Sequence, residues 1–204
     1  MRRPSHTVCT GKTPVLDASE VRQLLDSIDV STPAGLRDRA LIALVVFSFA
    51  RVGAALATRV EGVNVPQQRL WVRLREKGSK SHEMPCHHTL RVYLHVYIEE
   101  TGVASYPTEP LFRAIQRGTG HPGTTPRPQA NAYAMVRWRA LAAGIGTKIG
   151  NQTFRATGIA AYLKNGATLE NAAEMANHAS TRTTQLHGRR RDEIRLDEVE
   201  RIRV

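Results

Sequence analysis

The carboxyl-terminal part of the chain contains side chains that can bind or attack a phosphate group. It reads ANHASTRTTQLHGRRRDE over residues 176–193, with His178 and His187 nine residues apart and a basic run behind them. An imidazole can donate a hydrogen bond to a phosphate oxygen, and it can also accept a phosphoryl group as a nucleophile. This stretch is therefore a candidate catalytic segment.

Three further cations stand at positions where an anion can reach them. Arg51 directly follows an apolar helical run, where an arginine is costly to bury unless an anion or a carboxylate meets it. Lys77 lies in the tight turn EKGSK, and Arg155 lies at a helix start, where backbone N–H groups help to bind anions. Arg51 and Lys77 also have ordinary structural explanations, as a salt-bridged core arginine and a solvated hairpin lysine. His178 could equally be a helix-end histidine.

The periodicity of apolar residues predicts the elements that must position these side chains. Residues 1–14 are polar, with two prolines and a glycine, and read as a loose arm. Residues 16–28 have a capping-box pattern followed by apolar residues at helical spacing, which predicts an amphipathic helix. Residues 35–60 are apolar on nearly every face between positions 40 and 50, as in a helix buried in a core, and Arg51 interrupts the run.

The rest of the chain predicts a small sheet and further helices. Short runs over residues 60–65, 69–76 and 81–86 have β-branched or alternating apolar residues and suggest a small antiparallel sheet. Residues 89–102, 130–144, 154–166 and 168–178 read as helices, two of which end at glycines in the manner of C-caps. Residues 116–129 read as a loop. The expected fold class is α+β, mainly α-helical with one three-stranded antiparallel sheet.

Composition points to a polyanion as the partner. The 204 residues include 29 lysines and arginines against 18 acidic residues, a net charge of +11 and a pI near 10.5. Such a surface favours a nucleic acid, because neutralised phosphates release their counterions. The two cysteines, Cys9 and Cys86, form no CxxC pair, so neither a disulfide framework nor a zinc site is suggested. The start lacks an apolar stretch, and the longest apolar run is too short to cross a bilayer, so we expect a cytoplasmic protein and no membrane partner.

The order of three separated motifs carries a family resemblance. The segments GLRDRALIALVVFSFARVGAA, LREKGSKSHEMPC and FRATGIAAYLKNGATLENAAEMANH follow one another as in the tyrosine recombinase (phage integrase) family, and the similarity extends from Lys12 to Val204. The resemblance implies the catalytic-domain fold of that family. The chain positions that match the family's six catalytic positions are Arg51, Lys77, Gln152, Arg155, His178 and His187.

Two of these positions depart from the family pattern. The nucleophilic tyrosine is replaced by His187, and the first histidine of the H-x-x-R motif is replaced by Gln152. No tyrosine lies within the last forty residues to substitute, since the five in the chain are Tyr93, Tyr97, Tyr106, Tyr133 and Tyr162. A neutral imidazole is a competent nucleophile, but its outer nitrogen stops short of where a phenolic oxygen reaches. Gln152 can donate a hydrogen bond but cannot carry a proton or a charge as histidine can.

The resemblance also implies a role for each remaining residue. Two arginine forks, Arg51 and Arg155, would hold the non-bridging phosphate oxygens, and Lys77 would protonate the leaving 5′-oxygen. The full phosphate-binding set that we expect is Arg51, Lys77, Lys80, Arg155 and His178. The family intermediate is a covalent 3′-phosphotyrosyl ester that needs no metal, ATP or other cofactor, so none is expected here. With His187 in the nucleophile position, that intermediate cannot form.

The family comparison sets the expected organisation of the chain. Family members usually have a helical core-binding domain ahead of the catalytic one, and here only a short arm precedes the first predicted helix. We therefore expect an arm at 1–14 and an integrase-type catalytic domain at 15–204, without the amino-terminal domain. Residues 192–204 carry a loose apolar stripe that needs a docking surface. It either packs onto a neighbouring subunit in a homo-oligomer on DNA or folds back on its own domain.

Several functions remain open from the sequence. The first is a DNA breaking and rejoining domain, working or impaired, that serves DNA recombination and integration of a mobile element in the bacterial cytoplasm, associated with the nucleoid. The second is a catalytically inactive DNA-binding module that occupies sites or partners without cleavage. A third, metal-dependent hydrolysis, would have to use the histidines His82, His87, His88, His178 and His187. It is disfavoured because no H-x-x-x-H motif or carboxylate pair accompanies them, so no metal site is expected.

Overall fold

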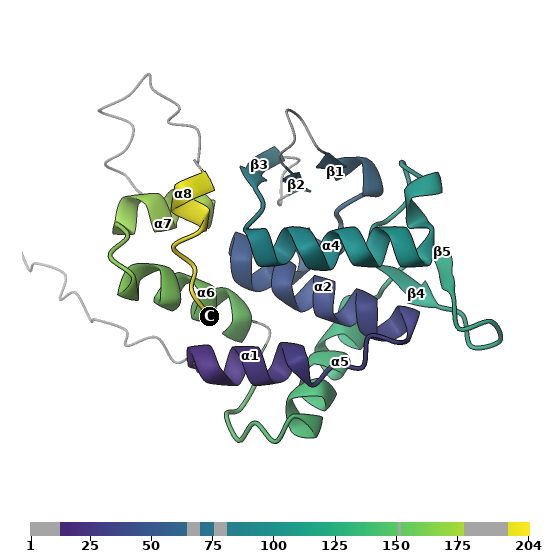
Figure 1. Cartoon of the computed structure of the whole chain (residues 1–204), viewed down its shortest axis with the longest axis horizontal. Coiled ribbons are helices and arrows are strands. Elements are labelled where there is room, and N and C mark those ends of the chain that lie inside the picture. The colour runs from purple at the N-terminus through teal and green to yellow at the C-terminus, as the bar shows by residue number, and fades with distance from the viewer. Residues whose placement is uncertain (1–12, 65–69, 76–80, 151, 178–195) are drawn as a thin grey trace, which may run out of the picture.

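A computed structural model of the protein describes residues 13–64, 70–75, 81–150, 152–177 and 196–204 (Figure 1). Its α-helices are α1 (Ala18–Asp26), α2 (Pro33–Ser48), α3 (Val52–Leu56), α4 (His88–Thr101), α5 (Gln129–Ala142), α6 (Thr153–Lys164), α7 (Leu169–Met175) and α8 (Leu196–Val199). Two short 3₁₀ helices are η1 (Val60–Gly62) and η3 (Val103–Ser105). The strands are β1 (Val63–Asn64), β2 (Trp71–Arg75), β3 (Ser81–Pro85), β4 (Arg113–Ile115) and β5 (Pro122–Pro126).

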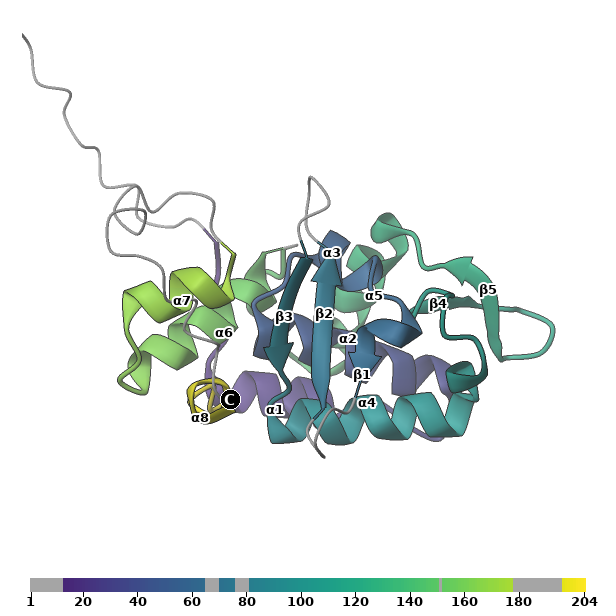
Figure 2. The same cartoon turned by 90° about the horizontal axis from the view of Figure 1, so that it is seen from above.

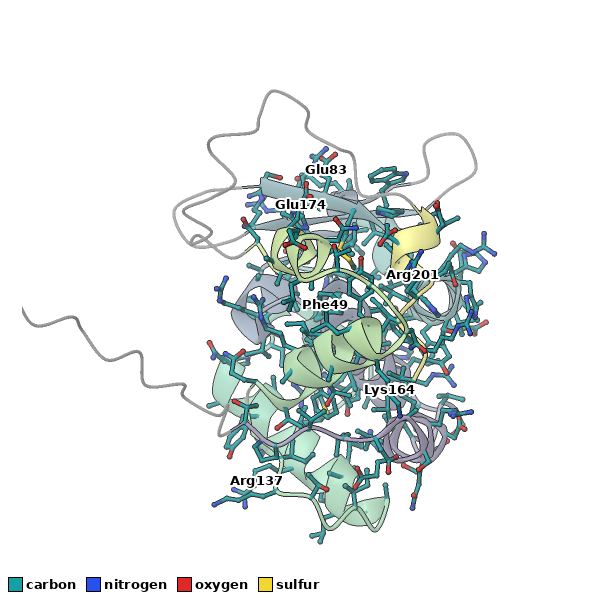
Figure 3. The ribbon with its side chains drawn as sticks, turned by 90° about the vertical axis from the view of Figure 1, so that its left-hand side faces the viewer. Phe49, Glu83, Arg137, Lys164, Glu174 and Arg201 are labelled. Atoms are coloured by element: carbon teal, nitrogen blue, oxygen red, sulfur yellow. The ribbon has the colours of Figure 1, made fainter. Side chains whose placement is uncertain are left out.

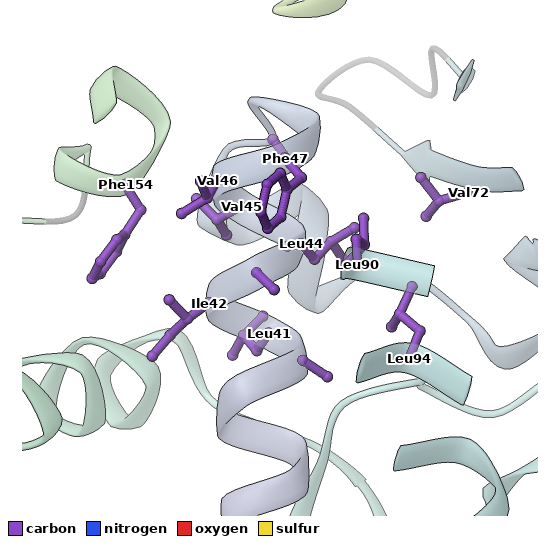
Figure 4. Close-up of a cluster of buried hydrophobic side chains, with 14 of the residues drawn as sticks. Leu41, Ile42, Leu44, Val45, Val46, Phe47, Val72, Leu90, Leu94 and Phe154 are labelled. Carbon is purple, nitrogen blue, oxygen red and sulfur yellow. The ribbon is translucent and has the colours of Figure 1, made fainter. Parts of the chain in front are cut away.

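Helix α2 is the central element, and other elements cover it on several sides. It begins at Pro33, and the hydroxyl of the N-cap Thr32 accepts a hydrogen bond from Gly35 N. Figure 4 shows Phe154 of α6 on one side of α2, and Leu90 of α4 and Val72 of β2 on the other. This arrangement explains why the sequence of α2 is apolar around its whole circumference, as expected for a helix buried in a core.

The predicted three-stranded sheet is confirmed, but its first strand is shorter than the run expected at 60–65, because residues 60–62 form η1. Its order is β1-β2-β3, and both pairs of neighbours are antiparallel. Val72 in the middle strand lies opposite Val63 on one side and Met84 on the other. In Figure 2 this sheet lies over α2, with α4 along its lower edge. The inward residues of β2 are buried and the alternate ones are exposed, as the period-two pattern predicts.

The sequence did not predict a second sheet, which the structure contains. β4 and β5 form a two-stranded antiparallel ribbon with a register shift, in which Arg113 pairs with Pro126 and Ile115 pairs with Pro122. The prediction of a loop for residues 116–129 was therefore wrong for residues 122–126. The reason is local: β5 begins and ends with proline and lacks apolar alternation, and proline is tolerated in a strand only at an edge.

The other predicted helices are confirmed, with one correction: the run over residues 35–60 is not one helix, because the chain turns at Phe49 and divides it into α2 and α3. At the start of α1, Asp17 and Glu20 form the capping box that their spacing indicates. Gly102 and Gly166 have φ of 66° and 81° just after α4 and α6, a conformation that glycine adopts without strain. Among the described residues, no helix combines the length and the apolarity that crossing a bilayer requires.

The described part of the carboxyl-terminal segment packs on the chain's own core. Val199 and Ile202 are both fully buried. Glu198 accepts hydrogen bonds from the hydroxyl of Tyr162 and from the side-chain amide of Asn171. Of the two arrangements expected for this segment, residues 196–204 adopt the one that folds back on their own domain.

Candidate functional site

The break between α2 and α3 places Arg51 at the surface. Helix α2 ends at Ser48. Its C-cap, Phe49, has a φ of 52°, which is unusual for a bulky residue and turns the chain sharply. The Phe49 ring is fully buried and packs edge-on against Tyr162 of α6, with ring centroids 5.7 Å apart. This packing holds the turn in place. Arg51 follows in an extended conformation as the N-cap of α3, and its side chain is exposed.

Arg155 lies inside the domain and joins two segments that are distant in sequence. It is only 5% exposed. One terminal nitrogen, Nη1, donates a hydrogen bond to the carbonyl oxygen of Phe49, and the other, Nη2, donates to that of Ala176 at 2.7 Å. Phe49 lies two residues before Arg51, and Ala176 lies two residues before His178. The guanidinium therefore connects the chain segments that lead to two other predicted site residues.

Helix α6 can hold Arg155 in this position because it lies very close to α2. Gly158 is the residue at the crossing, and a Cβ atom there would clash with the carbonyl oxygen of Val46. The glycine is thus required by backbone approach and not by its own backbone angles. Figure 3 shows Phe49 between α6, which carries Lys164, and α7, which carries Glu174. The three segments meet around the Arg155 guanidinium.

Gln152 lies one helical turn before Arg155. It is the N-cap of α6, its side chain is exposed, and that side chain makes no capping hydrogen bond. Positions three apart share a face of a helix, so Gln152 lies on the same side of α6 as Arg155 and closer to solvent. The structure therefore brings Arg51, Gln152 and Arg155 to one end of α2.

The other predicted site residues, Lys77, Lys80, His178 and His187, lie outside the described residues. Their neighbours in the described part of the chain show which elements precede and follow them. Arg75 and Ser81, which bound the segment with both lysines, are paired with each other in the sheet. Asn177, which precedes His178, has a φ of 45° and ends the last turn after α7.

The structure also contains a second polar cluster. The sequence named His87 and His88 among the histidines of a disfavoured metal-dependent hydrolysis, but it did not indicate Glu200. His87, His88 and Glu200 place their side-chain nitrogen and oxygen atoms within 4.8 Å of one another. Burial lowers the pKa of His87 to about 4, so its ring is neutral at pH 7. The histidine pair is visible in the sequence, but Glu200 is 112 residues from His88 and no spacing rule connects them.

Known proteins resemble this chain over most of its length. A profile described as the phage integrase family matches residues 14–193. The tyrosine recombinase XerD of Staphylococcus haemolyticus (strain JCSC1435) is 29% identical over 176 residues, which are 85% of this chain and 57% of that protein. The chain thus spans somewhat more than half the length of the curated relatives that it matches.

Solved structures share the fold. The XerH site-specific recombinase bound to palindromic difH substrate, in a post-cleavage complex, has a TM-score of 0.69 at 20% identity, covering 86% of this chain and 49% of that one. A lambda integrase tetramer bound to a Holliday junction has a TM-score of 0.62 at 16% identity, covering 94% of this chain and 54% of that one. The α+β fold expected from the sequence is confirmed by these likenesses.

Proposed function

This chain belongs to the phage integrase family, and on that premise we propose that it is a DNA-binding, strand-breaking and rejoining domain of a site-specific recombinase whose cleavage step is impaired. The observation that carries the proposal is the Arg155 guanidinium, which holds together the segments leading to Arg51 and His178. The two arginines that would bind a phosphate are present, whereas the position of the family's nucleophilic tyrosine holds His187. Residues 15–204 would form this catalytic domain.

The proposed site acts by positioning and charge. Exposed Arg51 would meet the non-bridging oxygens of the scissile phosphate, with Arg155 behind it. Lys77 would act as the general acid, and Lys80 and His178 would add hydrogen bonds to the same phosphate. The partner is double-stranded DNA, to which the net charge of +11 is complementary, so the protein would act where DNA is, in the bacterial cytoplasm. No metal takes part in this proposed chemistry.

The impairment follows from the two altered positions. In-line attack requires the nucleophile at the correct distance from phosphorus, and a displacement of about 1 Å can cost on the order of a hundredfold in rate. The shorter imidazole of His187 would be misplaced for the same backbone. Gln152 would keep one hydrogen-bond donor near Arg155 but would not supply a proton. We therefore expect His187 to be the larger of the two defects.

Covalent trapping on a nicked suicide substrate tests the proposal. We expect no denaturation-resistant protein–DNA adduct from the unaltered chain, an adduct from His187→Tyr, and a further increase with Gln152→His added. The control is Arg51→Ala in the double-substituted protein, which should bind DNA more weakly and lose the adduct. An acid-labile adduct from the unaltered chain, as expected for phosphohistidine, would show that cleavage is not impaired. A folded, DNA-bound double variant without any adduct would show that the defect lies elsewhere.

A second candidate function is a DNA-binding module that occupies sites or partners without cleavage. It is supported by the same two departures from the family pattern. Gln152 and His187 stand in place of reactive groups, whereas Arg51 and Arg155 are present. The two proposals differ in the single variant: restoring a tyrosine at position 187 yields an adduct only if the rest of the catalytic geometry is intact. Failure of both revertants to react, with specific DNA binding retained, favours the module.

Self-association on DNA is proposed to involve residues 192–204. The lambda integrase compared above was solved as a tetramer on a Holliday junction, and an analogous assembly needs contacts between subunits. In this chain the described residues 196–204 pack on their own domain, so an exchange between subunits would have to release Val199 and Ile202. Deleting residues 192–204 should abolish self-association on DNA; unchanged association would refute the role of this segment.

A further inference from the structure

The cluster of His87, His88 and Glu200 is formed by two segments that the fold brings together. His87 is the N-cap of α4 and has an extended backbone, whereas His88 is the first residue of the helix. Adjacent residues within a helix point in different directions, but this change of backbone lets the two rings approach, with centroids 4.2 Å apart. Glu200 follows α8, and its carboxylate accepts a hydrogen bond from His88 N at 2.8 Å.

We propose that these three residues form a binding site for a divalent transition-metal cation of the zinc class. Two imidazoles and one carboxylate are a ligand set that suits Zn²⁺. In a tetrahedral site with ligand distances of 2.0–2.1 Å, neighbouring ligand atoms are roughly 3.4 Å apart. His87 Nε2 and Glu200 Oε2 are 3.3 Å apart, which already meets this spacing. His88 is the most exposed of the three, with 66% of its side chain accessible, so it is the member that can adjust.

Space for a fourth ligand is present. The cluster opens into a cavity of about 570 Å³, whose wall is formed by α1, the start of α4 and the last residues of the described chain. His87, His88 and Glu200 all line it, together with Asp26 on the facing helix. A cation held by three protein ligands would keep its remaining position open to water or a small anion from this cavity.

Binding of a metal ion would require the His87 ring to change its tautomer. His87 Nδ1 accepts a hydrogen bond from Thr89 N at 3.1 Å, so the neutral ring carries its proton on Nε2, facing Glu200. Coordination through Nε2 would move that proton to Nδ1 and end the bond from Thr89. Thr89 N lies in the first helical turn, where backbone N–H groups have no partner within the helix, and its residue is partly exposed, so water can replace the lost acceptor.

The proposed ion would connect the carboxyl-terminal segment to the body of the domain. Glu200 lies between the two buried anchors Val199 and Ile202, and the histidines begin the helix that packs against α2. A ligand that binds the folded chain and not the unfolded one raises its stability by mass action. Zn²⁺ should therefore raise the unfolding temperature of the domain, and chelation should reverse the increase.

The test measures Zn²⁺ binding to the full chain by calorimetry, with Co²⁺ absorption as a report of coordination geometry. We expect one site that is lost or weakened at least about tenfold in His88→Ala and in Glu200→Gln. These positions are chosen because His87 is buried and its replacement can disturb folding. The matched controls are His95→Ala and Glu100→Gln, which change exposed residues of the same types on α4 and should bind as the unaltered chain does.

Two outcomes would overturn the proposal. One is binding of Zn²⁺ that is equally strong in the two site variants and in the two controls, because the ion would then be held by other histidines. The other is the absence of any tetrahedral Co²⁺ spectrum and of any rise in unfolding temperature in the unaltered, folded protein. Neither outcome depends on recombination, so this site and the proposed function stand or fall separately.

Discussion

Replacing Arg155 by alanine should destabilise the domain strongly, because its guanidinium satisfies two buried carbonyl groups. The acceptors belong to Phe49 and Ala176, which are 0% and 1% exposed. Stranding a buried acceptor costs about 1–3 kcal/mol, so the two together give about 2–6 kcal/mol. Typical domains are stable by about 5–15 kcal/mol, so this loss is a large fraction of the total. The segments leading to Arg51 and His178 would separate in the same variant.

Chemical denaturation monitored by circular dichroism measures this effect. Arg155→Lys keeps the charge but not the two-pronged fork, so it should recover about half of the loss by reaching one carbonyl. The control Arg137→Ala removes an exposed arginine and should change stability by less than about 0.5 kcal/mol. The reasoning is refuted if Arg155→Ala loses less than about 1 kcal/mol, a threshold below the cost of stranding both acceptors. If DNA affinity per folded molecule then falls sharply, the guanidinium acts mainly on phosphate.

Three further outcomes are expected. Gly158→Ala should cost about 1–3 kcal/mol, since its Cβ would clash with Val46 O, whereas Gly146→Ala, in open space, should be nearly neutral; equal effects in denaturation would contradict the close crossing of α6 and α2. Burial raises the pKa of Cys86 to about 12, so in a Cys9→Ser background its thiol should react with a maleimide at pH 8 only after unfolding; rapid native labelling would contradict its burial. DNA affinity should fall about tenfold or more between 50 and 200 mM salt even if only two phosphates are neutralised, and a flat titration would exclude a phosphate-dominated interface.

The elements with local signals were predictable from the sequence. The capping box at Asp17 and Glu20 is decided by residues three apart, and the buried character of α2 follows from its apolar run over residues 40–47. The three-stranded sheet was also predictable from a local pattern, because the alternation of apolar and polar residues along a strand shows which face is buried. The family resemblance then placed Arg51 and Arg155 in one site, and the structure brings both to the same end of α2.

The remaining features depend on contacts between distant residues, which no local pattern encodes. The strand at 122–126 is stabilised by pairing with β4, although its prolines argue against a strand. Sequence reasoning expected Arg155 to face an anion, and no pattern indicated that two carbonyls, 106 and 21 residues away, would accept its hydrogen bonds. The approach of Glu200 to His88 likewise depends on how the carboxyl-terminal segment packs.

The described structure also explains why substitutions at Arg155 and at position 152 should differ in their cost to the fold. Arg155 and Gly158 are buried, and their close neighbours make a substitution at either position costly to stability. Gln152, in contrast, is exposed, and its side chain does not cap α6. A substitution at such a surface position usually alters stability by no more than about 0.5 kcal/mol. Folding stability alone therefore requires Arg155, whether or not the protein cleaves DNA, whereas it places little constraint on the residue at position 152. A variant at position 152 should keep the stability of the unaltered chain, while loss of Arg155 should cost about 2–6 kcal/mol.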